Sequence, residues 1–303
     1  MMFGQRSSGL DQLIRRPERS LWEEFRQRPC VFLAKQIYTS RSLIPAQPVS
    51  NAVSVVCISD THNYQPQLPD GEILIHAGDL SQSGTFDEVQ KTILWIRQQP
   101  FEHKVVIAGN HDLILDPSRD QHNNAARSQL EWGDIIYLEN SSATLTCSNG
   151  RRLTVYGSPY SPKHGNWAFQ YPRHHDVWSE TPFGDIDIDI LITHAPPRGH
   201  LDLMSLGCTH LLSKLWQTRP LLHVFGHVHA GYGQEWLQFD AVQEAYERTI
   251  VAGGGILNLV YLAYRRFLAC FEAPMESRCL LVNPAIIGGL YDEKTRNPIQ
   301  VVI

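Results

Sequence analysis

Short apolar runs that alternate with polar loops begin at Val53 and continue through most of the chain. Runs of this length, rich in Val, Ile and Leu, are typical of strands buried on both faces of a parallel or mixed sheet. The pattern predicts strands at Val53–Ser59, Glu72–Ala77, His103–Ala108, Ile135–Leu138, Ala143–Cys147, Leu153–Gly157, Ile188–Thr193, Leu221–Phe225 and near Cys279–Asn283.

Helical spacing of apolar residues occurs between these strands. Thr85–Gln99 repeats apolar positions at intervals of three and four, with Thr85 as N-cap ahead of Glu88. Further helices are predicted over Leu201–Leu215 and from Asp240 to about Phe271, the second interrupted by Gly253–Gly255. Strands that alternate with helices predict an α/β fold.

The first 50 residues differ in character from the rest. A polar, Arg-rich stretch precedes the mixed segment Leu21–Tyr38, which we predict to be helical. We expect a partly helical N-terminal extension at residues 1–50 and a domain at residues 51–303 with a helical insertion at about 240–275. Leu21–Tyr38 and Ile250–Phe271 are each apolar on one side. They would pack on each other, form a dimer surface, cover the substrate or contact a membrane peripherally.

Composition narrows the class of protein. Of the 303 residues, 43% are hydrophobic and 19% charged, and the net charge of −5 argues against a nucleic-acid polymer as partner. The six cysteines show no CxxC spacing, which indicates reduced thiols and favours a cytoplasmic location. The start of the chain lacks a signal-peptide pattern, and Arg265 and Arg266 interrupt the longest apolar run, so we expect no transmembrane segment. No pattern indicates an oligomeric state.

Polar residues with metal-binding side chains follow five of the predicted strands. They are Asp60-Thr61-His62, Gly78-Asp79, Gly109-Asn110-His111-Asp112, Thr193-His194 and Gly226-His227-Val228-His229. Singly, each cluster is compatible with a turn or a cap, and their joint order is what favours a metal site. The carboxyl ends of strands in an open α/β sheet meet at one crevice, so the clusters should converge. A carboxylate such as Asp79 can bridge two cations, which is the arrangement of a two-metal hydrolase.

The order of these clusters resembles one known family. The pattern D-x-H, G-D, G-N-H-[DE], H and G-H-x-H runs complete from Asp60 to His229, as in the calcineurin-like metallophosphoesterase superfamily. Within it, segments 157–160, 167–169, 194–197 and 223–233 are similar to metallophosphoesterase-domain (MPPED-type) proteins. The resemblance implies a four-layer α/β/β/α sandwich with mixed sheets and helices on the outer faces. It also implies two metal sites that share Asp79, one with Asp60, His62 and His229, the other with Asn110, His194 and His227.

The resemblance further implies a metal-dependent phosphodiesterase of small substrates such as nucleotides, in which a hydroxide that bridges the metals attacks phosphorus. Asn110 and His111 would bind substrate, and His111 would protonate the leaving oxygen. Gln82 and Ser83 stand where protein phosphatases carry an acid and an arginine, which disfavours phosphoprotein substrates and leaves Asp112 as the candidate partner of His111. The ligand types suit Mn²⁺, Fe and Zn²⁺, and the resemblance favours Mn²⁺.

Two other functions are compatible with the same residues. A dinuclear-metal enzyme of specialised metabolism would use these ligands for oxidative or non-phosphorus chemistry. A weakly active regulatory or binding protein would keep the fold without the catalysis, although the complete ligand set argues against it. The metal content of protein purified without added metal would separate the first of these from a phosphoesterase.

Residues around the clusters have less specific patterns. Pro159-Tyr160, Trp167 and Phe169 would either wall the site or pack in the core, and we expect packing. His164, His174 and His175 are expected to be exposed loop residues. His200 and Asp202 either reach the mouth of the site or begin a helix.

Overall fold

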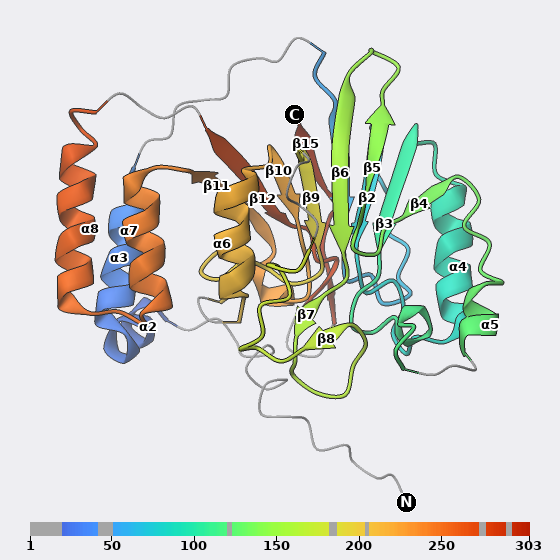
Figure 1. Cartoon of the computed structure of the whole chain (residues 1–303), viewed down its shortest axis with the longest axis horizontal. Coiled ribbons are helices and arrows are strands. Elements are labelled where there is room, and N and C mark those ends of the chain that lie inside the picture. Colours follow the sequence, from blue (N-terminus) through green and yellow to red (C-terminus); the bar gives the residue numbers. More distant parts are fainter. Residues whose placement is uncertain are drawn as a thin grey trace, which may run out of the picture.

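The computed structural model describes residues 20–41, 51–119, 123–181, 187–203, 206–272, 277–288 and 293–303. Two sheets pack face to face at its centre and helices cover the outer face of each (Figure 1). The expected four-layer α/β/β/α sandwich with mixed sheets is therefore confirmed. Residues 1–19 and 42–50 of the expected N-terminal extension lie outside the described part.

Both sheets combine parallel central strands with at least one antiparallel edge strand. The first has the order β15-β1-β2-β3-β4, and β15 is antiparallel to β1. The second has the order β11-β12-β10-β9-β6-β5, with β11 and β5 antiparallel to their neighbours. The first sheet comprises β1 (Ser54–Ile58), β2 (Ile73–Ala77), β3 (His103–Ile107), β4 (Ile135–Tyr137) and β15 (Ile299–Val302). The second comprises β5 (Ser141–Thr146), β6 (Arg152–Ser158), β9 (Ile190–Thr193), β10 (Leu222–Val224), β11 (Gly233–Gln238) and β12 (Arg278–Asn283).

Three apolar cores hold the layers together. The core between the sheets includes Val55, Ile75, Val105, Val155 and Ile192. On the outer face of the first sheet lies α4 (Phe86–Arg97), which begins at a capping box of Thr85 and Glu88, as predicted. On the outer face of the second sheet lies α6 (Thr209–Thr218). Two short pairs complete the strands: β7 (Ser161–Pro162) with β8 (Gln170–Tyr171), and β13 (Ile287–Gly288) with β14 (Lys294–Thr295).

The helix predicted over Leu201–Leu215 begins later than expected. Leu201 and Leu203 have φ angles of 49° and 55°, which no right-handed helix contains. The buried Asp202 carboxylate accepts hydrogen bonds from the N–H groups of Gly199 and Gly207, both at 2.9 Å, and so closes a loop. The predicted start was therefore wrong. Three short helices were not predicted: η1 (Leu113–Leu115), α5 (Asn123–Arg127) and η2 (His229–Gly231).

Four helices form a group of their own at one end of the molecule (Figure 1). They are α2 (Leu21–Gln27), α3 (Pro29–Thr39), α7 (Ala241–Val251) and α8 (Ile256–Leu268). Their common core includes Val31, Tyr38, Val242, Tyr246 and Leu262, so the two apolar segments do pack on each other. Gly253, Gly254 and Gly255 have φ angles of 70°, 120° and 108°, which glycine tolerates and which form the turn between α7 and α8. Within the described residues, no helix is both long and apolar enough to span a membrane.

A buried ionic network links α7 to the loop after β9. His200 is fully buried, with Nδ1 3.2 Å from Glu235 and Nε2 3.2 Å from Glu247. Burial would lower the pKa of His200, but the Glu235 and Glu247 carboxylates outweigh it and raise the pKa to about 10. His200 therefore serves this network, since both ring nitrogens are engaged in it.

Stability should depend on the charge of His200. Because its pKa in the folded state exceeds the ordinary 6.5, its contribution is complete below about pH 6.5 and is lost as the pH rises towards 10. We expect the free energy of unfolding of the wild type to fall by about 1 to 3 kcal/mol over that range relative to His200→Gln. Urea unfolding of both proteins at several pH values measures this. A difference between the two proteins that stays constant with pH would contradict the prediction.

Candidate metal centre

The predicted metal-binding side chains follow parallel strands of both sheets. Asp60 comes after β1, Asp79 after β2 and Asn110 after β3, whereas His194 follows β9 and His227 follows β10. Positive φ angles occur at Asp60 (49°), His62 (44°), Asp79 (55°) and His227 (67°). Each such residue costs roughly 1–3 kcal/mol of backbone strain, and strain of this kind concentrates at functional sites.

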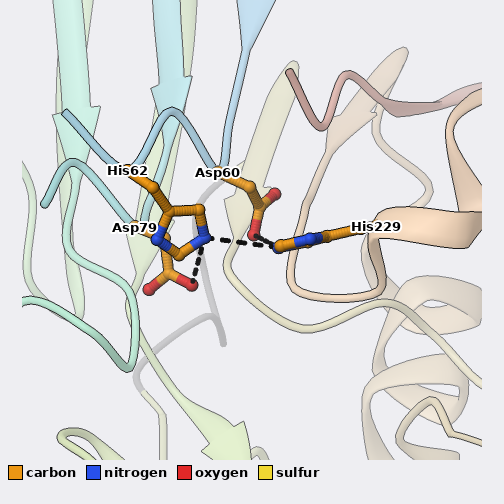
Figure 2. A group of neighbouring side chains, drawn as sticks. All are labelled: Asp60, His62, Asp79 and His229. Atoms are coloured by element: carbon orange, nitrogen blue, oxygen red, sulfur yellow. Dashed lines mark hydrogen bonds and ion pairs between the residues drawn. The ribbon is translucent and has the colours of Figure 1, made fainter. Parts of the chain in front are cut away.

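One group of four side chains converges from three loops. The ligand atoms of Asp60, His62, Asp79 and His229 all lie within 4.8 Å of one another. Figure 2 shows these side chains pointing to a common centre, with His62 Nε2 3.3 Å from His229 Nε2 and 3.8 Å from Asp79 Oδ2. His229 Nε2 lies 3.4 Å from Asp60 Oδ1. Two imidazole nitrogens that face each other between two carboxylates form a donor set suited to a cation.

A second group lies on the other side of Asp79. Asp79 Oδ1 is 3.4 Å from His194 Nε2. The Asn110 Oδ1 atom lies 2.9 Å from His194 Nε2 and 2.7 Å from His227 Nδ1. The two oxygens of Asp79 therefore face different groups of ligands, and all seven predicted metal-binding residues belong to one or the other.

Two glycines make room for the carboxylates. A Cβ atom at Gly109 would collide with Asp79 Oδ1, and one at Gly226 would collide with Asp60 Oδ2. Any side chain at these positions would displace the carboxylates from their present positions. The glycines of the sequence pattern thus have a steric reason in the structure.

Burial and mutual contact set the charges of the site. Burial lowers the pKa of His62 to about 4 and that of His227 well below its ordinary value, so both rings are neutral. Burial would raise the pKa of Asp79, but His194 and His111 hold it well below its ordinary value. Burial would also lower the pKa of His194, yet Asp79 raises it to about 9. A cation would therefore displace a proton from His194, and its binding should release protons.

Three supporting residues were missed by the sequence analysis. The Ser59 hydroxyl donates a 2.6 Å hydrogen bond to Asp60. The buried rings of His76 and His223 lie 2.9 Å and 2.8 Å from the hydroxyls of Thr61 and Thr193, next to Asp60 and His194. Both rings lie inside predicted strands, away from the strand-end pattern, which is why their side chains carried no signal.

The ring of His111 is held on three sides. Its Nδ1 donates a 2.8 Å hydrogen bond to the Gln82 carbonyl. The Trp167 indole stacks on it with ring centroids 4.2 Å apart and planes at 25°, and the His62 ring meets it at 4.7 Å and 85°. Since Nδ1 is engaged, Nε2 is the nitrogen left to contact a substrate.

Asp112 was expected to orient His111, and the structure corrects this. Its fully buried carboxylate accepts hydrogen bonds from the N–H groups of Leu80, Ser81 and Gly109 and from the Ser81 hydroxyl, at 2.6 to 3.1 Å. Burial and the nearby Asp79 raise its pKa to about 6. Asp112 therefore ties the loops after β2 and β3 together, and the Gln82 carbonyl takes the role expected of it.

The segment between β7 and β8 adds two side chains to the site. Phe169 is 6% exposed with φ at 53° and packs in the core, as expected. The Ala168 N–H donates to the Asn110 carbonyl at 3.0 Å, which places Trp167 on His111 rather than in the core. The His164 ring is half-buried with its centroid 4.7 Å from that of His227, so the expectation of an exposed residue is wrong for His164. His174 and His175 are exposed, as expected.

Several known proteins are similar to this chain. The family described as calcineurin-like phosphoesterase matches residues 53–231. Human metallophosphoesterase domain-containing protein 1 is 38% identical over 59% of this chain and 61% of its own length. A UPF0046 protein of Caenorhabditis elegans is 35% identical over 60% of this chain and 71% of that protein.

A relative from Emericella nidulans has the name of a lyase and not of a phosphoesterase. That protein, "probable rhamnogalacturonate lyase C", is 46% identical over 301 residues. The alignment spans 97% of this chain but only 29% of the relative. Its name therefore describes a protein most of which has no counterpart here.

Proposed function

This chain belongs to the calcineurin-like phosphoesterase family, and from that premise we propose that it hydrolyses small phosphodiesters, nucleotides among them, with two divalent metal ions. The observation that carries the proposal is the position of Asp79. Its Oδ2 faces His62 at 3.8 Å and its Oδ1 faces His194 at 3.4 Å. A carboxylate between two groups of ligands is the arrangement that a shared two-cation site requires.

The donors fit two such ions. One would be held by Asp60, His62, Asp79 and His229, and the other by Asp79, Asn110, His194 and His227. When bound, the pair would supply a nucleophilic water near neutral pH and offset the negative charge of the phosphoryl oxygens. Carboxylate, amide and imidazole donors suit Mn²⁺, Fe and Zn²⁺, and among these we favour Mn²⁺.

His111 is the proposed general acid. Because the Gln82 carbonyl holds Nδ1, the proton passed to the leaving oxygen would come from Nε2. The stacked Trp167 indole fixes the plane of the ring, which keeps Nε2 aimed at one point. Asn110 and His111, adjacent in the chain, would be the residues beside the phosphate.

The organic group of the ester would occupy a cavity of about 620 Å³ that Trp167 helps to line. A cavity of this size accommodates a small polar molecule. Gln82 and Ser83 are both exposed and take the place of the acid and arginine of protein phosphatases, which supports a small substrate over a phosphoprotein. The polar residues around the cavity include Ser118, Arg119, Asn140, Tyr160, Asn166 and Gln170.

The cysteines support a reducing compartment. All six are free thiols in the structure. Burial raises the pKa of the Cys57 and Cys279 thiols, which keeps both protonated and unreactive. We accordingly propose a cytoplasmic location.

The test is hydrolysis of bis-p-nitrophenyl phosphate by protein stripped of metal and then titrated with Mn²⁺. We expect turnover to appear, to saturate at about two ions per chain and to vanish with EDTA. A regulatory protein would stay inactive with both ions bound, and an oxidative enzyme would consume O₂. Protein that binds two ions and hydrolyses neither this diester nor a cyclic nucleotide would contradict the proposal.

A further inference from the structure

The outer side of α8 carries a continuous row of exposed apolar side chains. The row consists of Leu257, Val260, Tyr264, Phe267 and Phe271, which are 86%, 60%, 54%, 62% and 75% exposed. The first four recur within α8 at intervals of three and four residues, the spacing that places side chains on one side of a helix. Phe271 lies in the turn after α8, and its ring contacts Phe267 with centroids 5.3 Å apart. We call these five residues the α8 row.

Only the opposite side of α8 packs against the other helices of its group. Leu262 is fully buried and joins the core with α3 and α7. The α8 row points the other way, and α8 is the outermost element at its end of the molecule (Figure 1). Ile256 and Tyr261, 73% and 42% exposed, widen the row. Among the described residues, no side chain covers it.

The exposed area is too large for an ordinary monomer surface. Large apolar side chains present about 150–250 Å² each, so the seven residues at their exposed fractions leave on the order of 800 Å² open to water. The largest apolar patch on a typical monomer is about 300–600 Å². A stable protein interface buries about 800 Å² on each partner, which the α8 surface matches.

We propose that the α8 rows of two copies of this chain pack antiparallel around a two-fold axis. In that arrangement Leu257 meets Phe267 of the second copy, and Val260 meets Tyr264 of the second copy. Each aliphatic side chain then lies against an aromatic one and the layers fill evenly. In a parallel pair, Val260 would face Val260 of the second copy and Phe267 would face Phe267. Layers of small side chains would then alternate with layers of large ones, which pack less evenly. A two-fold axis also makes the contact self-limiting at a dimer.

The charges near the row favour a second copy over a membrane. Attraction to an anionic membrane takes a cluster of about four to eight basic residues. The last turn of α8 offers Arg265 and Arg266. Arg265 is already 3.8 Å from Glu272, and Arg266 donates to the Cys270 thiol at 3.4 Å. The spacing of three and four residues is also that of packed helix pairs.

Sedimentation velocity of the full chain from about 1 to about 100 µM tests the proposal. We expect a dimer in the wild type, and a dissociation constant raised about 100-fold or more by Val260→Glu with Tyr264→Glu. Leu94→Glu is the matched control, since Leu94 is 41% exposed on α4 and its replacement adds the same kind of charge elsewhere. Circular dichroism checks that all variants fold.

A cross-link tests the antiparallel register. Cys270 is exposed close by, so the experiment uses a Cys270→Ser background. A short bis-maleimide should join a mixture of Leu257→Cys and Phe267→Cys chains, whereas Leu257→Cys alone should not link to itself. Self-linking of Leu257→Cys would overturn the antiparallel arrangement. A wild type that stays monomeric would overturn the proposed interface, whether or not that monomer binds anionic vesicles. A dimer whose dissociation constant is unchanged by the two glutamates would overturn it as well.

Discussion

Replacing Asp79 by asparagine should abolish tight binding of at least one metal ion and lower turnover of bis-p-nitrophenyl phosphate on the order of 10³-fold. Asparagine keeps the shape of the side chain. It also keeps an oxygen that can accept the 2.8 Å hydrogen bond from the His111 backbone N–H, so the loop should keep its conformation. The variant loses the charge that faces both groups of ligands. Elemental analysis after dialysis, together with turnover, measures the effect.

Asp202→Asn is the matched control for this variant. Asp202 is 1% exposed and Asp79 2%, but Asp202 is hydrogen-bonded to the backbone of its own loop. We expect Asp202→Asn to lower thermal stability and to leave the metal content of the folded protein unchanged. Full metal content in Asp79→Asn would remove Asp79 from the metal centre. Equal metal loss in both variants would point to unfolding as its cause.

The second large effect is expected at His111 and should depend on the leaving group. A 2′,3′-cyclic nucleotide opens to a basic alkoxide that needs a proton, whereas p-nitrophenolate leaves without one. His111→Ala should therefore lower kcat for the cyclic nucleotide about 10²–10⁴-fold and have a much smaller effect on bis-p-nitrophenyl phosphate. Steady-state kinetics with both substrates measure the ratio.

Three further variants separate positioning from folding. Trp167→Leu should lower the ratio of kcat for the cyclic nucleotide to kcat for bis-p-nitrophenyl phosphate by less than His111→Ala does, since it frees the His111 ring without removing it. Trp167→Phe should restore most of this ratio, because it keeps a ring stacked on His111. His175→Ala should change neither rate, because His175 is an exposed residue 3.6 Å from Glu180. Equal losses on both substrates in His111→Ala would point to a binding role and against the general acid.

The central strands were predictable because their burial leaves a direct trace in the sequence. All five residues of β2 are buried, and its sequence is accordingly an apolar run interrupted only by His76. The start of α4 was equally local, since Thr85 and Glu88 cap each other within one turn. The edge strands β11 and β15 were missed. Their residues are mostly half-buried or exposed, so they have no continuous apolar run.

The sequence by itself determined which residues gather at the strand ends, because parallel strands bring the turns that follow them to one edge. Only the tertiary structure decided which of them touch. Asp112 is next to His111 in the chain, yet its carboxylate turns to the backbone of Leu80 and Ser81, while the Gln82 carbonyl reaches the His111 ring. The same holds for α8, which is apolar on two sides. Hydrophobic spacing identifies such a helix, but which side faces inward depends on helices distant in the sequence, and here it is the side of Leu262.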